Sequence, residues 1–378
     1  MKYYLVAGEA SGDLHASNLM RGIKEADSTA SFRYYGGDLM QAQGGVLAKH
    51  YRSMAFMGFL EVIQNIRTIS KNLKHCMEDI LQFNPDAVIL VDYPGFNLRI
   101  ARFAKENGFK VFYYIAPKVW AWKESRVKLL KRYLDKLFVI FPFEVDFFKK
   151  HGIDAIYQGN PLIDAIAQKA GAETSFSEFC QTNNLDDKPI IALLAGSRKQ
   201  EIRFNLPIML SLISRLPEYQ FVIAGAPSLD TDVYLPYIGS SNVKLIFDQT
   251  QTLLKHSTLA IVTSGTATLE AALLNVPEVV CYRGDTFSML IAWMVIKVKY
   301  ISLVNLIMGK EVVRELKQFD YTASNLLEQV KRILPGREER NEMLENFQTL
   351  KDMLGSVGSS KRIAQIIVDN TNTKIHTS

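Results

Sequence analysis

The sequence predicts an α/β protein with two Rossmann-like domains facing a cleft. Short apolar runs rich in β-branched and aromatic residues alternate with amphipathic segments, which is the rhythm of parallel strands joined by helices. That rhythm occurs twice, on either side of a polar stretch at residues 168–187. The length of 378 residues also exceeds what one hydrophobic core usually supports. Two such halves in one chain place the expected ligand site in a cleft between them.

The individual strands follow from the apolar runs. In the first half they are expected at residues 3–7, 32–35, 87–92, 110–115 and 136–141. In the second half they are expected at residues 190–194, 221–224, 243–247, 259–263 and 278–282. The resulting domain prediction is a first domain at 1–165, a linker region at 166–188, a second domain at 189–335 and C-terminal helices at 336–378. For those last helices, crossing back to the first domain or to a partner subunit stays open.

Composition excludes several classes of protein. A net charge of +5 suits an anionic substrate or membrane surface but is too small and too dispersed to predict nucleic-acid binding. No apolar stretch reaches the ~20 residues that span a bilayer, and the start enters a strand without a cleavable signal pattern. Cys76, Cys180 and Cys281 form neither a disulfide framework nor a zinc motif. A cytoplasmic protein is expected.

The turn after the first strand is the first candidate half-site. Ligands of open α/β sheets bind at the carboxyl ends of strands. Gly8 and Gly12 let a substrate approach the backbone, while Glu9, Ser11 and Asp13 supply hydrogen-bond acceptors. A tight turn in which Asp13 caps the next helix explains the same residues, so this turn alone does not distinguish a substrate site from a structural turn.

A second half-site follows the strand at 190–194. Gly196, Ser197 and Arg198 come just before a helix expected to begin near Gln200. A helix amino end offers N–H groups and a positive dipole end, and a hydroxyl and a guanidinium complete a pyrophosphate clamp. The alternative is an ordinary turn with a surface arginine.

A third turn follows the strand at 259–263. Ser264, Gly265 and Thr266 fall on the turn, and Glu270 lies one helical turn further on. A carboxylate there accepts hydrogen bonds from ribose hydroxyls, although a glutamate near a helix start also gains some tenths of a kcal/mol from the dipole. Together with residues 196–198, this turn favours nucleotide binding, with one turn for the diphosphate and one for the sugar.

Five motifs in order, together with residues 300–306 (YISLVNL), resemble those of the lipid-A-disaccharide synthase family of glycosyltransferases. The five are residues 7–13 (AGEASGD), 91–97 (VDYPGFN), 117–122 (PKVWAW), 195–198 (AGSR) and 264–270 (SGTATLE). The resemblance covers nearly the whole chain. It departs from the usual family pattern at Val304, where proline is usual, and at Gly95, but neither change removes a chemical group.

That resemblance implies a GT-B fold and an inverting, metal-independent transfer. The donor would be UDP-2,3-diacylglucosamine and the acceptor 2,3-diacylglucosamine 1-phosphate. The products would be the β-1,6-linked lipid A disaccharide 1-phosphate and UDP.

Inverting transfer needs a base for the attacking hydroxyl and positive charge where the diphosphate departs. Asp92 ends the apolar strand that begins at Ala87, and the resemblance places it on the family's essential aspartate. We predict that Asp92 is the base, with a turn formed with Pro94 as the structural alternative and Glu9 as the other candidate base. Arg198 is assigned to stabilising the leaving group.

Two asparagines complete the predicted sites. Asn97 is assigned to the acceptor side with Gly8, Ser11 and Gly12, and Asn305 to the nucleotide side. Both are expected to orient substrate groups, with turn capping as the competing interpretation.

No metal or other cofactor is predicted. Asp230 and Asp232 resemble a metal-binding Asp-x-Asp, but their polar loop favours a solvent-exposed turn. The six histidines show no ligand spacing.

The diacylated substrates imply peripheral contact with the cytoplasmic surface of the inner membrane. Residues 54–60 and the apolar run 287–296, followed by Lys297 and Lys299, are candidate contacts, although a core segment or subunit contact explains either run. Residues 117–123 with Arg126 are a further candidate for binding the acceptor phosphate or the membrane. A homodimer stays open.

Three rival functions remain. Another GT-B enzyme, such as a UDP-sugar epimerase or a different lipid-linked sugar transferase, would use the same nucleotide half-site. A nicotinamide oxidoreductase is disfavoured because residues 8–12 lack the G-x-G-x-x-G spacing. A non-catalytic membrane protein with an inactive nucleotide fold is disfavoured by the complete set of catalytic groups.

Overall fold

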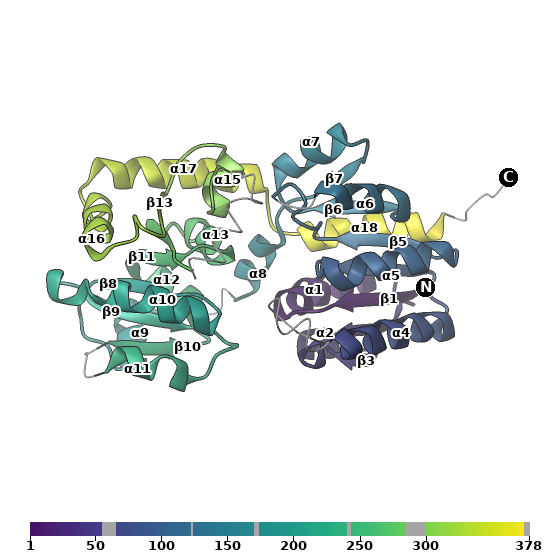
Figure 1. Cartoon of the computed structure of the whole chain (residues 1–378), viewed down its shortest axis with the longest axis horizontal. Coiled ribbons are helices and arrows are strands. Elements are labelled where there is room, and N and C mark those ends of the chain that lie inside the picture. Colours follow the sequence, from purple (N-terminus) through teal and green to yellow (C-terminus); the bar gives the residue numbers. More distant parts are fainter. Residues whose placement is uncertain (55–65, 122–123, 170–173, 240–242, 285–298, 374–378) are drawn as a thin grey trace. The chain divides into compact units, whose positions relative to one another are not determined.

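The computed structural model describes residues 1–54, 66–121, 124–169, 174–239, 243–284 and 299–373 (Figure 1). The chain divides into two compact units, each built on one sheet. Unit 1 comprises Met1–Ala165 with Leu354–Ser378, and unit 2 comprises Ile166–Met353. No helix among the described residues is both long enough and apolar enough to cross a membrane.

Unit 1 contains a seven-stranded parallel sheet in the order β3-β2-β1-β4-β5-β6-β7. Its strands are β1 (Lys2–Ala7), β2 (Ser31–Gly36), β3 (Val46–His50), β4 (Ala87–Val91), β5 (Lys110–Tyr114), β6 (Lys136–Val139) and β7 (Ala155–Tyr157). The chain builds outward from β1 in one direction and from β4 in the other. The direction of winding therefore reverses between β1 and β4, which is where open α/β sheets bind ligands.

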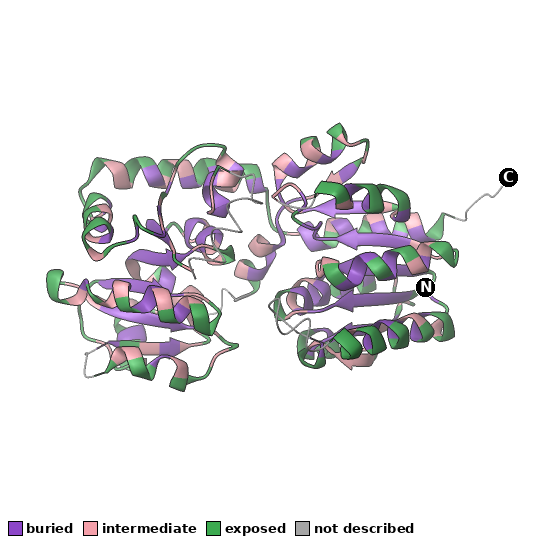
Figure 2. Cartoon of the chain, in the orientation of Figure 1, coloured by how far each residue is buried: buried purple, intermediate pink, exposed green. Residues whose placement is uncertain are grey.

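Helices cover both faces of this sheet and bury its strands (Figure 2). They are α1 (Ala10–Ala26), α2 (Asp38–Ala42), α4 (Ile66–Phe83), α5 (Pro94–Glu106), α6 (Val127–Tyr133), α7 (Pro142–Lys150) and α18 (Ser359–Asn372). Helix α8 (Pro161–Lys169) begins in unit 1 and ends in unit 2. Short 3-10 turns are η1 (Tyr51–Ser53) and η2 (Glu124–Arg126). Side chains alternate along a strand, so Tyr3 and Leu5 pack with α1 and α18, whereas Tyr4 and Val6 pack with α4 and α5.

Unit 2 contains a six-stranded parallel sheet in the order β10-β9-β8-β11-β12-β13. Its strands are β8 (Ile190–Leu194), β9 (Gln220–Gly225), β10 (Lys244–Phe247), β11 (Ser257–Thr263), β12 (Glu278–Tyr282) and β13 (Arg314–Lys317). Its helices are α9 (Phe176–Thr182), α10 (Lys199–Leu210), α11 (Leu235–Ile238), α12 (Thr250–Lys255), α13 (Thr266–Leu273), α15 (Leu303–Met308), α16 (Ala323–Arg332) and α17 (Glu338–Leu354). Its 3-10 turns are η3 (Ile213–Arg215) and η4 (Thr231–Val233). Here the winding reverses between β8 and β11.

The end of the chain returns to unit 1. The last helix, α18, packs on α1, where a Cβ on Gly22 would lie 2.8 Å from the Cβ of Ala364. Asp164 caps α18, since its carboxylate accepts the N–H groups of Gly358 at 2.6 Å and Ser360 at 2.9 Å. The predicted C-terminal segment 336–378 is thus divided: α17 lies in unit 2 except for its last residue, and α18 lies in unit 1.

Two further differences from the sequence prediction concern element boundaries. The expected linker 166–188 contains α9, whose Phe179 is buried in the core of unit 2 with Ile190 and Leu253. Strands β3, β7 and β13 were not predicted. Each lies at an edge of its sheet, where one side of the strand has no neighbour.

Candidate active site

In unit 1 the predicted acceptor turn and the predicted base leave the sheet side by side. Strands β1 and β4 pair in parallel with Ala7 opposite Val91, so Gly8 and Asp92 are the next residues at the same edge. This is the point where the winding of the sheet reverses. The structure therefore brings together Gly8, Glu9 and Asp92, which are distant in sequence.

Asp92, the predicted base, is partly buried on a turn of left-handed backbone. Its backbone φ is 44°, in the left-handed region, and Tyr93 follows at 50°. Burial raises the pKa of the Asp92 carboxyl, while the positive charge of Lys118 opposes the rise. A carboxylate with a raised pKa holds a proton more strongly, which suits it to deprotonate a sugar hydroxyl.

Gly8 is required by packing as well as by any substrate. A Cβ at Gly8 would lie 2.3 Å from the Tyr93 ring, so only glycine leaves room for that ring. The Tyr93 hydroxyl donates a hydrogen bond to the Met54 carbonyl at 3.0 Å. Glu9 is the N-cap residue of α1 and is partly buried, and its charge adds to the burial that raises the pKa of Tyr93.

Asp13 does not cap the helix that follows the first strand. It lies inside α1, and its buried carboxylate accepts N–H groups from Gly37 at 2.8 Å, Leu39 at 3.0 Å and Met40 at 3.1 Å. It therefore caps α2 and ties that helix to α1. Ser11 is exposed on the first turn of α1, at the edge that carries Asp92.

Asn97 shapes the turn that carries Asp92. Its side chain is fully buried, and its Nδ2 lies 2.8 Å from the Asp92 carbonyl and 3.2 Å from the carbonyls of Val6 and Val91. These contacts are those of the turn-capping alternative, while the Asn97 Oδ1 has no hydrogen-bond partner among the described residues. The acceptor contact of Asn97 stays a prediction.

Glu144 is a residue at this edge that the sequence analysis missed. It is 1% exposed and accepts hydrogen bonds from the N–H groups of Ile140 and Phe141 and from the Trp120 indole at 2.9 Å. Burial raises its pKa to about 7, against the effect of these donors and of Lys118. A glutamate in the first turn after Pro142 was the available signal. Through Trp120, Glu144 holds the loop that carries Lys118, whose charge acts on Asp92.

In unit 2 the predicted diphosphate turn also lies where the winding reverses. Strands β8 and β11 pair with Leu194 opposite Val262, so residues 195–198 and 264–266 leave one edge together. Arg198 is the N-cap residue of α10, and 67% of its side chain is exposed. Its guanidinium lies 3.8 Å from the carboxylate of Glu201.

Glu201 also contacts the backbone that was expected to bind phosphate. Its Oε2 accepts the Ser197 N–H at 2.9 Å, and its side chain lies against Gly196, whose φ is 120°. The sequence analysis predicted that the backbone N–H groups here are free to bind a ligand. In the structure the N–H of Ser197 is instead bonded to the carboxylate of Glu201. The signal was a glutamate three residues beyond the cap, a common partner of a helix amino end.

The turn after β11 holds the predicted sugar-binding residues. Gly265 and Thr266 are exposed at the start of α13, and the Ser264 hydroxyl donates to the Ile301 carbonyl at 2.8 Å. Glu270 is partly buried on α13 and accepts a hydrogen bond from Gln251 at 2.8 Å. The structure therefore places Glu270 beside the exposed turn, with one of its oxygens bonded.

Asn305 does not present its amide to a ligand. It is fully buried; its Oδ1 accepts N–H groups from Val312 and Val313, and its Nδ2 donates to Val313 and Glu315. Glu315 also accepts the N–H groups of Ile301 and Ser302. These contacts build the loop against which Ser264 is held, and the nucleotide contact of Asn305 stays a prediction.

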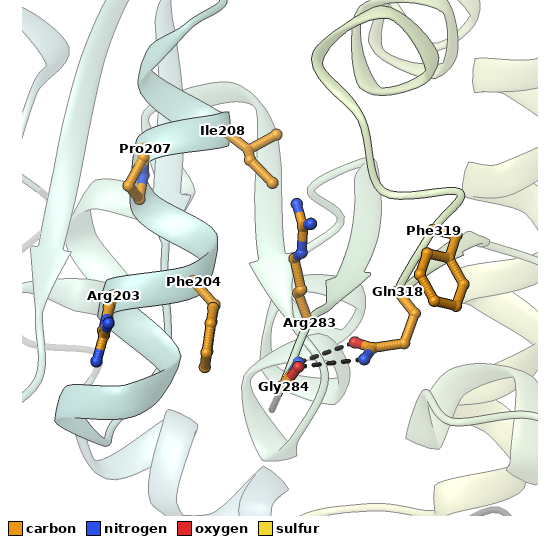
Figure 3. A pocket seen from close by; sticks show the side chains of 8 residues that line it. All are labelled: Arg203, Phe204, Pro207, Ile208, Arg283, Gly284, Gln318 and Phe319. Carbon is orange, nitrogen blue, oxygen red and sulfur yellow. Dashed lines mark hydrogen bonds between the residues drawn. The ribbon is translucent and has the colours of Figure 1, made fainter. Parts of the chain in front are cut away.

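A pocket of about 370 Å³ lies near the end of β12 (Figure 3). The residues that line it include Arg203, Arg283 and Phe319, and Phe319 is 74% exposed. Gln318 closes one side by exchanging two hydrogen bonds with the Gly284 backbone, at 2.9 and 3.1 Å. The pocket adds positive charge to unit 2 beyond that of Arg198.

Several predicted features carry no further structural detail. Asp232 lies in the exposed turn η4, and Asp230 immediately precedes it. Among the described residues, no three acidic, histidine or cysteine side chains are grouped as a metal site. The candidate membrane segment 287–296 lies outside the described residues, as does 54–60 apart from the buried Met54. Trp122 also lies outside them.

Two parallel sheets with polar turns at both reversal points define the GT-B class of nucleotide-sugar enzymes. The family model described as lipid-A-disaccharide synthetase matches residues 3–367. The chain belongs to the lipid-A-disaccharide synthase family. The lipid-A-disaccharide synthase of Myxococcus xanthus is 37% identical, over 97% of this chain and 96% of its own. That of Geobacter sulfurreducens is 34% identical over the same shares.

Solved structures with a similar fold are more distant in sequence. The UDP-GlcNAc 2-epimerase of Neisseria meningitidis, bound to UDP-GlcNAc, matches with a TM-score of 0.69 at 17% identity, covering 98% of this chain and all of that one. The S. aureus MnaA–UDP structure matches with a TM-score of 0.69 at 15% identity, covering 98% of this chain and 97% of that one. This likeness confirms the predicted GT-B fold alone.

Proposed function

We propose that this chain is an inverting glycosyltransferase of lipid A synthesis. It transfers 2,3-diacylglucosamine from UDP-2,3-diacylglucosamine to 2,3-diacylglucosamine 1-phosphate, forming a β-1,6 linkage and releasing UDP. Membership of the lipid-A-disaccharide synthase family supports the reaction. The observation that carries the mechanism is Asp92, a carboxylate of raised pKa at the reversal point of the unit 1 sheet.

Unit 1 supplies the base. The acceptor's 6-hydroxyl attacks the anomeric carbon of the donor, and Asp92 takes the hydroxyl proton as the new C–O bond forms. Burial of Asp92 favours this step because it disfavours the ionised carboxylate and so strengthens the base. Glu9, at the end of the neighbouring strand, is the second candidate for the same proton.

Unit 2 supplies positive charge for the leaving group. As the bond from the anomeric carbon to the diphosphate oxygen breaks, its electron pair stays on UDP, and the exposed guanidinium of Arg198 stabilises the growing charge. The N–H groups of Gly265 and Thr266 at the start of α13 add to this field, and Glu270 accepts hydrogen bonds from the ribose. Binding of the diphosphate displaces Glu201 from the Ser197 N–H.

In this proposal the arginine and the helix amino ends neutralise the diphosphate, and no metal ion is required. Activity should therefore persist in excess EDTA. A loss of activity in EDTA that Mg²⁺ or Mn²⁺ restores would contradict this part.

The proposed substrates carry acyl chains, so the enzyme would meet them at a membrane surface. We propose peripheral contact with the cytoplasmic face of the inner membrane, which a net charge of +5 supports if that surface is anionic. A homodimer stays a prediction.

The test supplies purified protein with both diacylated sugars and follows UDP release and the disaccharide product. Release of UDP that requires the acylated acceptor supports the proposal. UDP release with a non-acylated sugar alone, or conversion of the donor to its epimer without acceptor, would favour the rival GT-B functions.

A further inference from the structure

We propose that Tyr113 is a positioning residue: its hydroxyl, together with the amide of Asn97, holds the Asp92 backbone in the left-handed turn that aims the catalytic carboxylate. The inference rests on the proposed role of Asp92 as the base. It assigns a function to a tyrosine on β5 that none of the sequence motifs includes.

The turn at Asp92 is strained. Asp92 and Tyr93 have consecutive φ values of 44° and 50°, and neither is glycine. Backbone of this kind is unfavourable for residues other than glycine, so the conformation persists only where surrounding contacts enforce it. Strain of this kind gathers at functional sites because it fixes a side chain in a direction that relaxed backbone would not give.

The enforcing contacts converge on one peptide oxygen. The Asp92 carbonyl accepts a hydrogen bond from the Tyr113 hydroxyl at 2.6 Å and one from Asn97 Nδ2 at 2.8 Å. On the other side of the residue, the Asp92 N–H donates to the Tyr114 carbonyl at 3.0 Å. The backbone N–H and carbonyl of Asp92 are therefore both held by β5, which fixes the point from which its carboxylate projects.

Tyr113 is suited to this role by its own surroundings. It is fully buried among the side chains beneath α5 and α6, where the ring is fixed by packing. Burial raises the pKa of its hydroxyl well above the usual value, and the charge of Asp92 raises it further. The hydroxyl therefore keeps its proton at any working pH and remains a donor.

The next residue provides a matched control. Tyr114 lies on the same strand and is also fully buried, but its side chain points to the opposite face, among residues of α1 and α18. Replacing it with phenylalanine removes a buried hydroxyl and keeps the backbone carbonyl that accepts the Asp92 N–H. Tyr113→Phe removes the hydroxyl that donates to the Asp92 carbonyl, whereas Tyr114→Phe removes a buried hydroxyl on the opposite face that makes no bond to Asp92.

The experiment compares Tyr113→Phe, Tyr114→Phe and Asp92→Asn in steady-state transfer between the two diacylated sugars. Tyr113→Phe should lower kcat about 10-fold or more with KM within about 2-fold, because a displaced base loses reactivity and not binding. Its acidic limb of the kcat–pH profile should move to lower pH, since a relaxed carboxylate is better solvated. Tyr114→Phe should leave kcat and that limb unchanged.

The double variant separates the possible failures. Tyr113→Phe should cause no further loss in the Asp92→Asn background, because residues that act as one unit are not additive. A normal kcat in Tyr113→Phe, or an equal loss with and without the carboxylate, overturns the positioning role while the base assignment stands. Full activity of Asp92→Asn overturns the base assignment itself. Should Tyr113→Phe not fold, Asn97→Ser removes the other donor and carries the same expectation.

Discussion

The two sheets present different kinds of edge at their reversal points. In unit 1 the acidic side chains are held by the protein: Asp13 caps α2, Glu144 has three donors, and Asp92 sits on a strained turn. In unit 2 the edge is exposed and cationic, and its Arg198 has only a loose contact with Glu201. A base must be fixed and desolvated before its substrate arrives, whereas an anion site must exchange an internal partner for a ligand.

The largest effect should come from removing the fixed charge of unit 1. Asp92→Asn keeps the shape of the side chain and abolishes the base, so kcat should fall about 10²- to 10⁴-fold. UDP affinity, measured by calorimetry, should stay as in the unsubstituted protein because unit 2 is untouched. If transfer continued within about 3-fold of normal, the base would have to be sought elsewhere, with Glu9→Gln as the next variant.

Substitution of Arg198 in unit 2 should weaken the binding of UDP. Arg198→Ala removes a charge-assisted contact worth about 1.5–3 kcal/mol, so the Kd for UDP should rise about 10- to 100-fold. Thermal stability without UDP should change little, because the side chain is mostly exposed. Arg215→Ala, on the turn η3, is the matched surface-arginine control. Equal UDP affinity in both variants would remove Arg198 from the diphosphate site.

Most of the fold was predictable from the sequence because its central strands are continuous apolar runs. Every predicted strand is present, with ends shifted by at most two residues. Of the four edge strands, β10 was predicted from its apolar run, but β3, β7 and β13 were not. β13 reads Arg-Glu-Leu-Lys and β7 has three residues, so neither shows a buried period, and their pairing depends on a neighbour already in place.

Glu9, Asp92 and Arg198 come two, one and four residues after β1, β4 and β8, and their roles stay predictions. The position of such a residue was predictable from the strand end before it. A role that depends on a distant partner was not predictable. In the sequence Tyr113 is indistinguishable from a core residue, whereas in the structure its hydroxyl donates to the carbonyl of Asp92, 21 positions away. Glu144 is similarly indistinguishable from a glutamate at a helix start, whereas in the structure it accepts a hydrogen bond from Trp120. The contacts of Asn97 and Asn305 with the backbone of their own loops were likewise not predictable in detail, although turn capping was the stated alternative for both.

Glu278 is a buried carboxyl that lies at neither reversal point, so it contrasts with the acidic residues of both. Glu278 at the start of β12 is fully buried, and neither of its oxygens has a hydrogen-bond partner among the described residues. Burial raises its pKa well above the usual value, so the folded protein holds a proton that the unfolded chain releases. Its effect is therefore a loss of stability as pH rises from the ordinary glutamate value toward the folded-state pKa.

Glu278→Gln should remove that loss. In urea unfolding from pH 5 to 8, the free energy of unfolding of the unsubstituted protein should carry a falling component of up to about 1.4 kcal/mol per pH unit from this one proton. The variant should lack it and be the more stable protein at pH 8. Glu338→Gln, at an exposed glutamate on α17, is the control. Parallel pH curves for all three proteins would mean that Glu278 is ionised in the folded state at no cost.

The smallest expected effect tests whether Glu201 competes with UDP for the Ser197 N–H in unit 2. Glu201 Oε2 accepts the Ser197 N–H that the diphosphate is proposed to use, so ligand and carboxylate compete for one donor. Glu201→Gln keeps a carbonyl oxygen for the bond in the free protein but removes the negative charge that repels the ligand. Calorimetry should therefore show UDP binding tightened by a few-fold, with the gain fading at high salt as screening weakens the repulsion. Weaker binding in this variant would assign Glu201 to holding Arg198 in place for the ligand, and the unit 2 edge would then be as preorganised as that of unit 1.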